Sequence, residues 1–184
     1  MIIAFFGITC VGKTTIGKIV ANELQYDFFD LDAEMKSYYN DTILGIQRGC
    51  FGDALDAKKA TVLKYILSGC GDRAVIAMSS IYYTVKYKLM FRNNKVFSIL
   101  LQDSPENIVK RMVYTDDLDI VIKNPERDYK AELKDIRYFI SRYKKAFDRI
   151  EHKYDIAGNT ADAAANEIIE TIIKPYCVAN GIEV

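Results

Sequence analysis

The strongest constraint on the fold of this chain is a regular alternation between short apolar runs and longer runs of helical spacing. The short runs are apolar or β-branched, as are strands that helices cover on both faces. They are Ile2–Phe6, Asp27–Phe29, Ala74–Met78, Val96–Leu101 and Tyr154–Ile156. The longer runs are Lys13–Leu24, Ala54–Leu67, Pro105–Val113, Ala131–Ile150 and Ala161–Ile173. Because strands that alternate with helices form βαβ units, we expect a three-layer α/β/α fold with a five-stranded parallel sheet.

Composition limits the classes of protein to which the chain can belong. Its 184 residues are about the size of one domain, so we expect residues 1–184 to form a single domain. The formal net charge is zero, whereas a general nucleic-acid binder carries a basic excess. No apolar run reaches membrane-spanning length, and the N-terminus lacks the basic region of a signal peptide. Four scattered cysteines and one histidine offer no zinc motif. We expect a cytoplasmic monomer without a nucleic-acid or membrane partner.

A phosphate-binding motif follows the first predicted strand. The segment "GITCVGKT", residues 7–14, matches G-x-x-x-x-G-K-[ST] and runs into a predicted helix. Its glycines permit a tight loop with inward N–H groups, and the helix N-terminus adds partial positive charge. Lys13 is predicted to bind the β- and γ-phosphates of ATP, and Thr14 to ligate Mg²⁺. The predicted ATP-binding residues are Gly7, Thr9, Cys10, Val11, Gly12, Lys13, Thr14 and Thr15.

The carboxylates that a phosphotransferase needs follow the second predicted strand. The chain has no N-K-x-D guanine signature, which argues against a GTPase. "YDFFDLDAEM" places Asp30 and Asp32 at the strand end, where one can face the metal and the other the acceptor. We predict that Asp30 is the metal partner and that Asp32 orients or deprotonates an attacking hydroxyl. The alternative is that Asp32 caps the helix "DAEMKSYY". Asp103 is interpreted as a loop residue.

These motifs together resemble the shikimate kinase family of P-loop kinases. The resemblance rests on "FFGITCVGKTTIGKIVANELQYDFFDLDAEM" and the following "TILGI". It implies that Lys13 and Thr14 bind ATP and Mg²⁺, that Asp30 holds the metal through water, and that Asp32 contacts the acceptor hydroxyl. Weaker similarity in "VFSILLQDSPENIVKRM" implies that Arg111 lies close to the nucleotide and contributes to catalysis. The loop near residues 158–159, Gly158 and Asn159, would approach adenine.

The acceptor half departs from the family pattern. Where the family has a Phe-Arg pair that grips the shikimate carboxylate, an ungapped alignment places Leu55-Asp56. Where it has three glycines, this chain has Ser79-Ser80-Ile81. The charged residues 114–130, called here the lid segment, are expected to form either a lid or a solvated loop that runs into a helix. The segment lacks the family Arg-Pro-Leu-Leu, and Leu118 falls near the expected arginine. Lys58 and Lys59 are close in sequence but are predicted to point away from Asp56 on a helix.

These departures predict a small-molecule kinase that phosphorylates a hydroxyl of a different acceptor. A polyol, sugar, nucleoside or amine-bearing acceptor would suit the polar residues. True shikimate phosphorylation and a regulatory nucleotide-binding module remain alternatives, as does a nucleoside-monophosphate kinase, although the middle of the chain shows no clear paired-arginine phosphate clamp. The predicted acceptor residues are Asp32, Asp56, Ser79 and Ser80, with Tyr82 or Tyr83 as additions that ordinary packing also explains. Arg127, Arg137 and Arg142 are candidates to close over the site, although the last two also fit an exposed basic helix face.

Overall fold

Five parallel strands form the sheet predicted from the alternating pattern. The computed structural model describes residues 1–50, 52–81, 85–123 and 125–183, so Tyr82 and Tyr83 lie outside the described residues. The strand order is β2-β3-β1-β4-β5. The strands are β1 (Ile2–Phe6), β2 (Asp27–Asp30), β3 (Ala74–Ala77), β4 (Val96–Gln102) and β5 (His152–Asp155). All paired strands are parallel, which confirms the predicted fold class.

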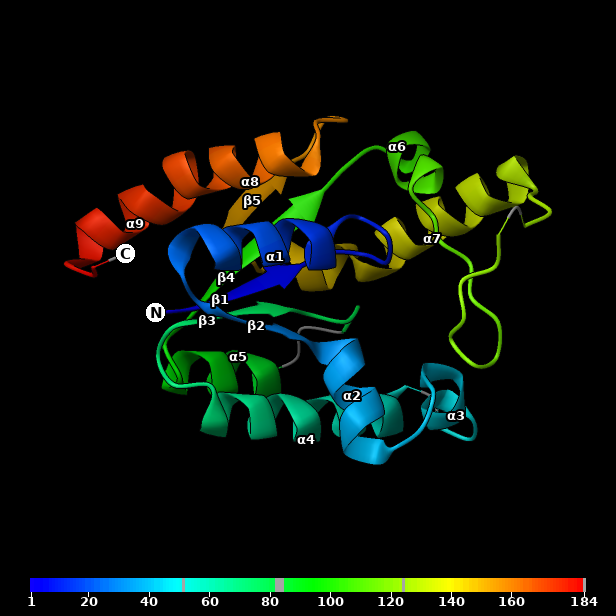
Figure 1. Ribbon diagram of the computed structural model, residues 1–184, viewed down its shortest axis with the longest axis horizontal. Coiled ribbons are helices and arrows are strands. Elements are labelled where there is room, and N and C mark those ends of the chain that lie inside the picture. The colour runs from blue at the N-terminus through cyan, green and yellow to red at the C-terminus, as the bar shows by residue number, and fades with distance from the viewer. Residues whose placement is uncertain (51, 82–84, 124, 184) are drawn as a thin grey trace.

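Helices cover both faces of this sheet, as Figure 1 shows. On one face α1 (Lys13–Leu24) lies beside α8 (Ala161–Ile168), which continues through the π-helical turn Ile169–Ile173 into α9 (Lys174–Asn180). On the other face lie α4 (Asp53–Gly69) and α5 (Val85–Asn93). The helices α2 (Leu31–Tyr39), α3 (Ile43–Gln47), α6 (Pro105–Lys110) and α7 (Tyr129–Phe147) complete the described set. The three layers follow from βαβ connectivity.

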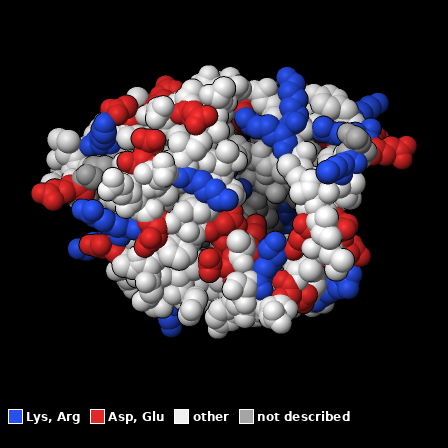
Figure 2. Space-filling view, in the orientation of Figure 1, with Lys and Arg blue, Asp and Glu red and all other residues white. Residues whose placement is uncertain are grey.

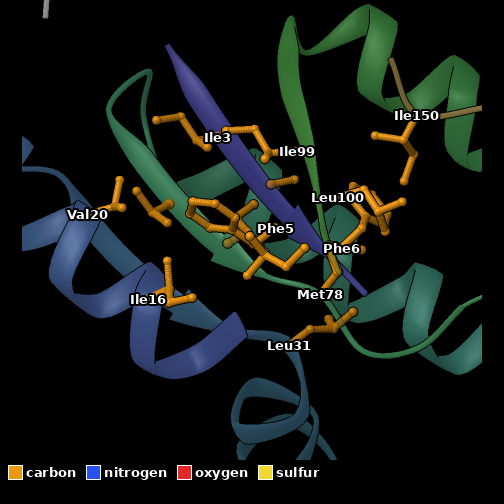
Figure 3. Close-up of a cluster of buried hydrophobic side chains, with 14 of the residues drawn as sticks. Ile3, Phe5, Phe6, Ile16, Val20, Leu31, Met78, Ile99, Leu100 and Ile150 are labelled. Carbon is orange, nitrogen blue, oxygen red and sulfur yellow. The ribbon is translucent and has the colours of Figure 1, made fainter. Parts of the chain in front are cut away.

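The core is centred on β1, whose five residues are all buried. Phe5 is fully buried, and Figure 3 shows it with Ile16 and Val20 of α1 on one side of the strand region. Ile3 is paired with Val75 of β3 and Phe97 of β4, so β1 is central in both order and packing. A strand buried on both faces shows no alternation of polar and apolar residues, so the continuous apolar run Ile2–Phe6 was recognisable as a strand from the sequence. This burial fixes the position of the loop that follows β1.

Several element boundaries differ from the predicted ones for local reasons. The helix α6 ends at Lys110 rather than at Val113, because Arg111 leaves the helical conformation with φ −97° and ψ 1°. The helix α7 begins at Tyr129 because the Asp128 side chain accepts a hydrogen bond from the N–H of Ala131. The helices α3, α5 and α9 were not predicted. Within the described part of the chain, no helix is long and apolar enough to cross a bilayer.

Candidate active site

The loop between β1 and α1 has the shape that its glycines predict. Gly7 has φ 141°, and a Cβ there would lie 2.7 Å from the carbonyl oxygen of Leu101 and from Val11 Cγ1. Gly12 has φ 116° and is the N-cap of α1. Because both conformations disfavour L side chains, the two glycines are required by the backbone path. Cys10 takes a left-handed conformation at φ 59° within the same loop.

Lys13 folds back over this loop. Its Nζ donates hydrogen bonds to the carbonyl oxygens of Gly7 at 3.0 Å and Ile8 at 2.7 Å. Burial lowers the pKa of Lys13 to about 8, although the nearby carboxylates of Asp32 and Asp30 partly offset the shift. The ammonium is therefore held at the phosphate side of the loop with its charge weakly solvated, as an anion-binding group would be.

Thr14 and Asp30 face one another across the start of α1. The Thr14 hydroxyl donates to Asp30 Oδ2 at 2.6 Å. Asp30 Oδ1 accepts from the backbone N–H groups of Asp32 at 3.0 Å and Ala33 at 3.2 Å, so Asp30 is the N-cap of α2. The alternative role predicted for Asp32, capping this helix, is thus wrong: the strand-end carboxylate takes that role. A Thr hydroxyl beside a carboxylate is a donor pair that suits Mg²⁺ together with phosphate and water oxygens.

Asp32 is free of the cap and turns toward the end of β3. The Ser79 hydroxyl donates a short hydrogen bond to Asp32 Oδ1. Asp32 and Thr9 line two cavities, one on the side of the P-loop and one on the side of α4. A carboxylate at such a junction is placed to act between two bound molecules.

The cavity on the P-loop side, called here the donor cavity, has a volume of about 300 Å³. Most of the predicted ATP-binding residues line it. The lining residues are Thr9, Cys10, Gly12, Lys13, Thr14, Thr15, Asp30, Asp32, Met78, Arg111 and Val113. Gly7 contributes through its carbonyl contact with Lys13, and Val11 faces a separate 170 Å³ cavity under α7. Figure 2 shows a hollowed face with basic and acidic side chains around its rim.

Arg111 reaches the donor cavity from the end of α6. Its guanidinium pairs with the fully buried carboxylate of Asp103 at 2.5 Å. Burial raises the pKa of Asp103, but hydrogen bonds from Asn107 and Arg111 outweigh it and hold the pKa below its ordinary value. Arg111 also belongs to the described lining of the donor cavity, so its guanidinium places a cationic group there for an anion. A nucleotide phosphate fits this donor set.

The second cavity, called here the acceptor cavity, has a volume of about 420 Å³. Its described lining includes Asp32, Ser79 and Ser80 but not Asp56, although Asp56 was predicted to contact the acceptor. The Asp56 carbonyl instead accepts a hydrogen bond from the Tyr87 hydroxyl at 2.7 Å. The described lining is Thr9, Asp32, Ile43, Gln47, Cys50, Leu55, Lys59, Ser79, Ser80, Phe139 and Tyr143.

Lys59 is the charged residue of the described acceptor-cavity lining that sequence reasoning did not assign to the acceptor. It is only 8% exposed, and its Nζ donates to the carbonyl oxygen of Ser80 at 2.9 Å. Burial lowers its pKa and the carboxylates of Asp32 and Asp56 oppose that shift, so its predicted orientation away from Asp56 stays a prediction. A signal was present: Lys59 shares the apolar face of α4 with Val62, Leu63 and Ile66, at helical spacing. A lysine on such a face must be buried.

The lid segment is held near α2 and α3 by acidic residues. Asp119 pairs with Lys36 at 3.3 Å and accepts from the backbone N–H of Ile43 at 3.4 Å, while Asp117 pairs with Arg48 at 3.6 Å. Thr115 and Val121 form an antiparallel bridge within the segment. The contacts of the lid segment with Lys36, Ile43 and Arg48 are therefore made by carboxylates.

The arginines proposed to close over the site have other contacts. Arg127 pairs with Glu132 at 2.6 Å and donates to the carbonyl oxygen of Val109 at 2.7 Å. Arg137 pairs with Glu106 at 2.9 Å, and Arg142 donates to the Tyr138 hydroxyl at 2.7 Å. None of the three belongs to the described lining of either cavity.

Gly158 and Asn159 follow β5 in a turn where the Asn159 N–H donates to the Ile156 carbonyl at 2.9 Å. Gly158 has φ 77°, and a Cβ there would lie 3.1 Å from the Asn107 side chain. Neither residue belongs to the described lining of the donor cavity. The predicted approach of this loop to adenine stays a prediction.

The chain matches a known protein family over most of its length. A family model described as shikimate kinase matches residues 9–173. The chain belongs to the shikimate kinase family. Members of this family are phosphotransferases that act on an alcohol hydroxyl and use ATP as a substrate.

Individual relatives cover nearly the whole chain. A shikimate kinase of Caldanaerobacter subterraneus subsp. tengcongensis is 27% identical over 180 residues, covering 94% of this chain and 96% of that protein. A shikimate kinase structure from Bacteroides thetaiotaomicron superposes with a TM-score of 0.77 at 14% identity, covering 94% and 98%. The shikimate kinase of Acinetobacter baumannii in complex with shikimate superposes with a TM-score of 0.74 at 21% identity, covering 95% and 93%. At these identities the structures show a shared fold.

Proposed function

We propose that this chain transfers the γ-phosphate of ATP to a hydroxyl of a small molecule, at an acceptor site altered from that of shikimate kinases. The observation that carries the proposal is the position of Asp32, which lines both the donor and the acceptor cavity. Family membership supports ATP as the donor and an alcohol as the acceptor. The altered lining, with Ser79, Ser80 and Lys59, supports a changed acceptor preference.

Each side chain of the site has a separate role in the proposed reaction. Lys13 and Arg111 bind the phosphates and offset the charge that builds up during transfer. Asp32 accepts the proton of the acceptor hydroxyl while the oxygen of that hydroxyl attacks the γ-phosphorus of ATP. The bond from that phosphorus to the β–γ bridging oxygen breaks, and ADP leaves. Thr14 and Asp30 would hold Mg²⁺, which neutralises phosphate charge when bound.

Acceptor-dependent ADP release tests the proposal. The assay presents ATP and Mg²⁺ with hydroxy acids, polyols, sugars and nucleosides, beginning with shikimate. We expect ADP release that depends on one acceptor class and is lost in Lys13→Ala. Tight ATP binding without turnover of any acceptor would instead support a regulatory nucleotide-binding module.

True shikimate phosphorylation is the second candidate. The family match over residues 9–173 favours it, because that match spans the acceptor half as well as the P-loop. Saturable turnover of shikimate at sub-millimolar concentration would establish this candidate and contradict the altered acceptor site. Turnover of another alcohol with little activity on shikimate would support the altered site.

A further inference from the structure

Lys59 is a buried cation at the floor of the acceptor cavity. Its side chain rises from the apolar face of α4, and its Nζ is fixed by the Ser80 carbonyl at the end of β3. Burying an ammonium group is costly unless charged or polar partners compensate for the lost water. Folding tolerates that cost here at a position that lines a cavity, so the ammonium is available to a bound molecule.

The surroundings of Lys59 link it to the reaction centre. Burial lowers the pKa of Lys59, and the carboxylates of Asp32 and Asp56 oppose that shift. The Ser80 hydroxyl contacts the Gly7 carbonyl at 3.5 Å, and the same carbonyl accepts from Lys13. Lys13 and Lys59 therefore approach Asp32 from different sides, one from the P-loop and one from the acceptor cavity.

Charge is scarce elsewhere in the acceptor cavity. Among its described lining residues, Asp32 and Lys59 are the charged ones. One oxygen of Asp32 accepts the Ser79 hydrogen bond, and the proposed reaction requires this carboxylate as a base. Ile43, Leu55 and Phe139 supply apolar surface. The cavity thus combines a proton acceptor, an apolar wall and one lysine ammonium.

We infer that Lys59 is the specificity-determining residue of the acceptor cavity and selects an acceptor that carries one carboxylate besides its hydroxyl. This inference rests on the proposed function. The ammonium would pair with the acceptor carboxylate while the acceptor hydroxyl faces Asp32. A phosphorylated acceptor suits the site less well, because a dianion beside Asp32 would meet only one compensating lysine. This assignment differs from an arginine clamp at position 56, where the chain carries Asp56.

Paired acceptors that differ only in charge test the inference. Shikimate is compared with its methyl ester, and gluconate with gluconamide, by ADP release at saturating ATP. For wild type we expect kcat/KM to favour the acid of at least one pair by about 10- to 100-fold. In Lys59→Met this ratio should fall to near one, mainly through KM for the acid, and Lys59→Arg should restore part of it.

Lys58→Met is the matched control, because it removes the same charge from the preceding residue of α4. Lys58 Nζ donates to the Ile46 carbonyl at 3.3 Å and lies over the Tyr39 ring, and it does not line the acceptor cavity in the described structure. The control should keep the wild-type ratio. A folded Lys59→Met variant that keeps the ratio would overturn the inference.

A pH profile of wild type tests the same point if Lys59→Met does not fold. The groups that face Lys59 or its cavity are Asp32, Asp56, Lys13, Cys50 and Tyr143. Their effects on ATP binding and on the chemical step are common to acid and ester and cancel in the ratio. The ratio therefore reports the charges that meet the acceptor carboxylate, and Lys59 is the cation in the described lining of the cavity. Because the ammonium binds the carboxylate, the ratio should fall as pH rises through the lowered pKa of Lys59. A ratio that does not change with pH would overturn the inference.

Failure of the inference and failure of the proposed function give different results. Turnover that favours neutral acceptors, with no response to Lys59→Met, overturns the role of Lys59 but leaves the kinase function intact. No ADP release with any acceptor overturns the proposed function and the inference with it.

Discussion

The donor and acceptor sides of the site obtain their residues in different ways. The donor cavity takes most of its lining from one continuous loop, residues 9–15, directly after β1. The acceptor cavity collects side chains from α2, α3, α4, the end of β3 and α7. Because the donor side depends on a local backbone shape, it is readable in eight consecutive residues. The acceptor side depends on how distant helices pack, so its chemistry is set by tertiary contacts.

The largest expected effect comes from Asp32, where the two sides meet. Asp32→Asn keeps the shape of the side chain but removes the base, so kcat should fall by about 10²–10⁴-fold. ATP affinity, measured by calorimetry, should change little, because Lys13 and Arg111 remain. An Asp32→Asn variant with near wild-type kcat would show that the junction of the two cavities is not the reaction centre.

Replacement of Ser79 tests the acceptor side of the site. Its hydroxyl holds one oxygen of Asp32, which we interpret as positioning rather than contact with the acceptor. Ser79→Ala removes one hydrogen bond to a charged group, so kcat should fall by about tenfold or more. A change confined to the KM of the acceptor would instead favour the originally predicted acceptor contact.

The donor side should respond to pH through Lys13. Its pKa is lowered to about 8, so the ammonium is charged below that pH and is lost above it. At saturating acceptor, kcat/KM for ATP should therefore fall about tenfold per unit above pH 8. Bound phosphates favour the ammonium, so kcat at saturating ATP should stay level to higher pH. An ATP kcat/KM that is level from pH 7 to 10 would contradict this role.

The smallest expected effect is on stability, through the Asp103–Arg111 pair. Asp103→Asn weakens hydrogen bonds to a fully buried carboxylate and should cost about 1–3 kcal/mol of unfolding free energy. The pKa of Asp103 is below its ordinary value, so its contribution is present near neutral pH and is lost as pH falls through the folded-state pKa. The free energies of unfolding of wild type and variant, measured by denaturant titration, should become equal at acidic pH. Equal stability at pH 7 would contradict the pairing.

Prediction from the sequence succeeded where local pattern and tertiary role coincide. The boundaries of β1 and α1 were predicted to the residue, because an apolar strand, a glycine loop and an amphipathic helix follow one another without interruption. The helix α5 was missed although Thr84, a residue type common at helix N-caps, directly precedes its first residue in the sequence. Asp30 and Asp32 were recognised from the sequence as a pair of carboxylates. Only the structure showed which of the two caps α2, and that residue is Asp30.

The sequence by itself determined the parallel α/β fold, the phosphate loop and the carboxylates beside it, because each depends on neighbours within a few residues. The tertiary structure decided the acceptor side. It directed Lys59 into the cavity, left Asp56 out of the described lining and joined Ser79 to Asp32. The physical reason is that the face a helix residue presents is local, whereas the surface it meets is set by the packing of α4 against the sheet end.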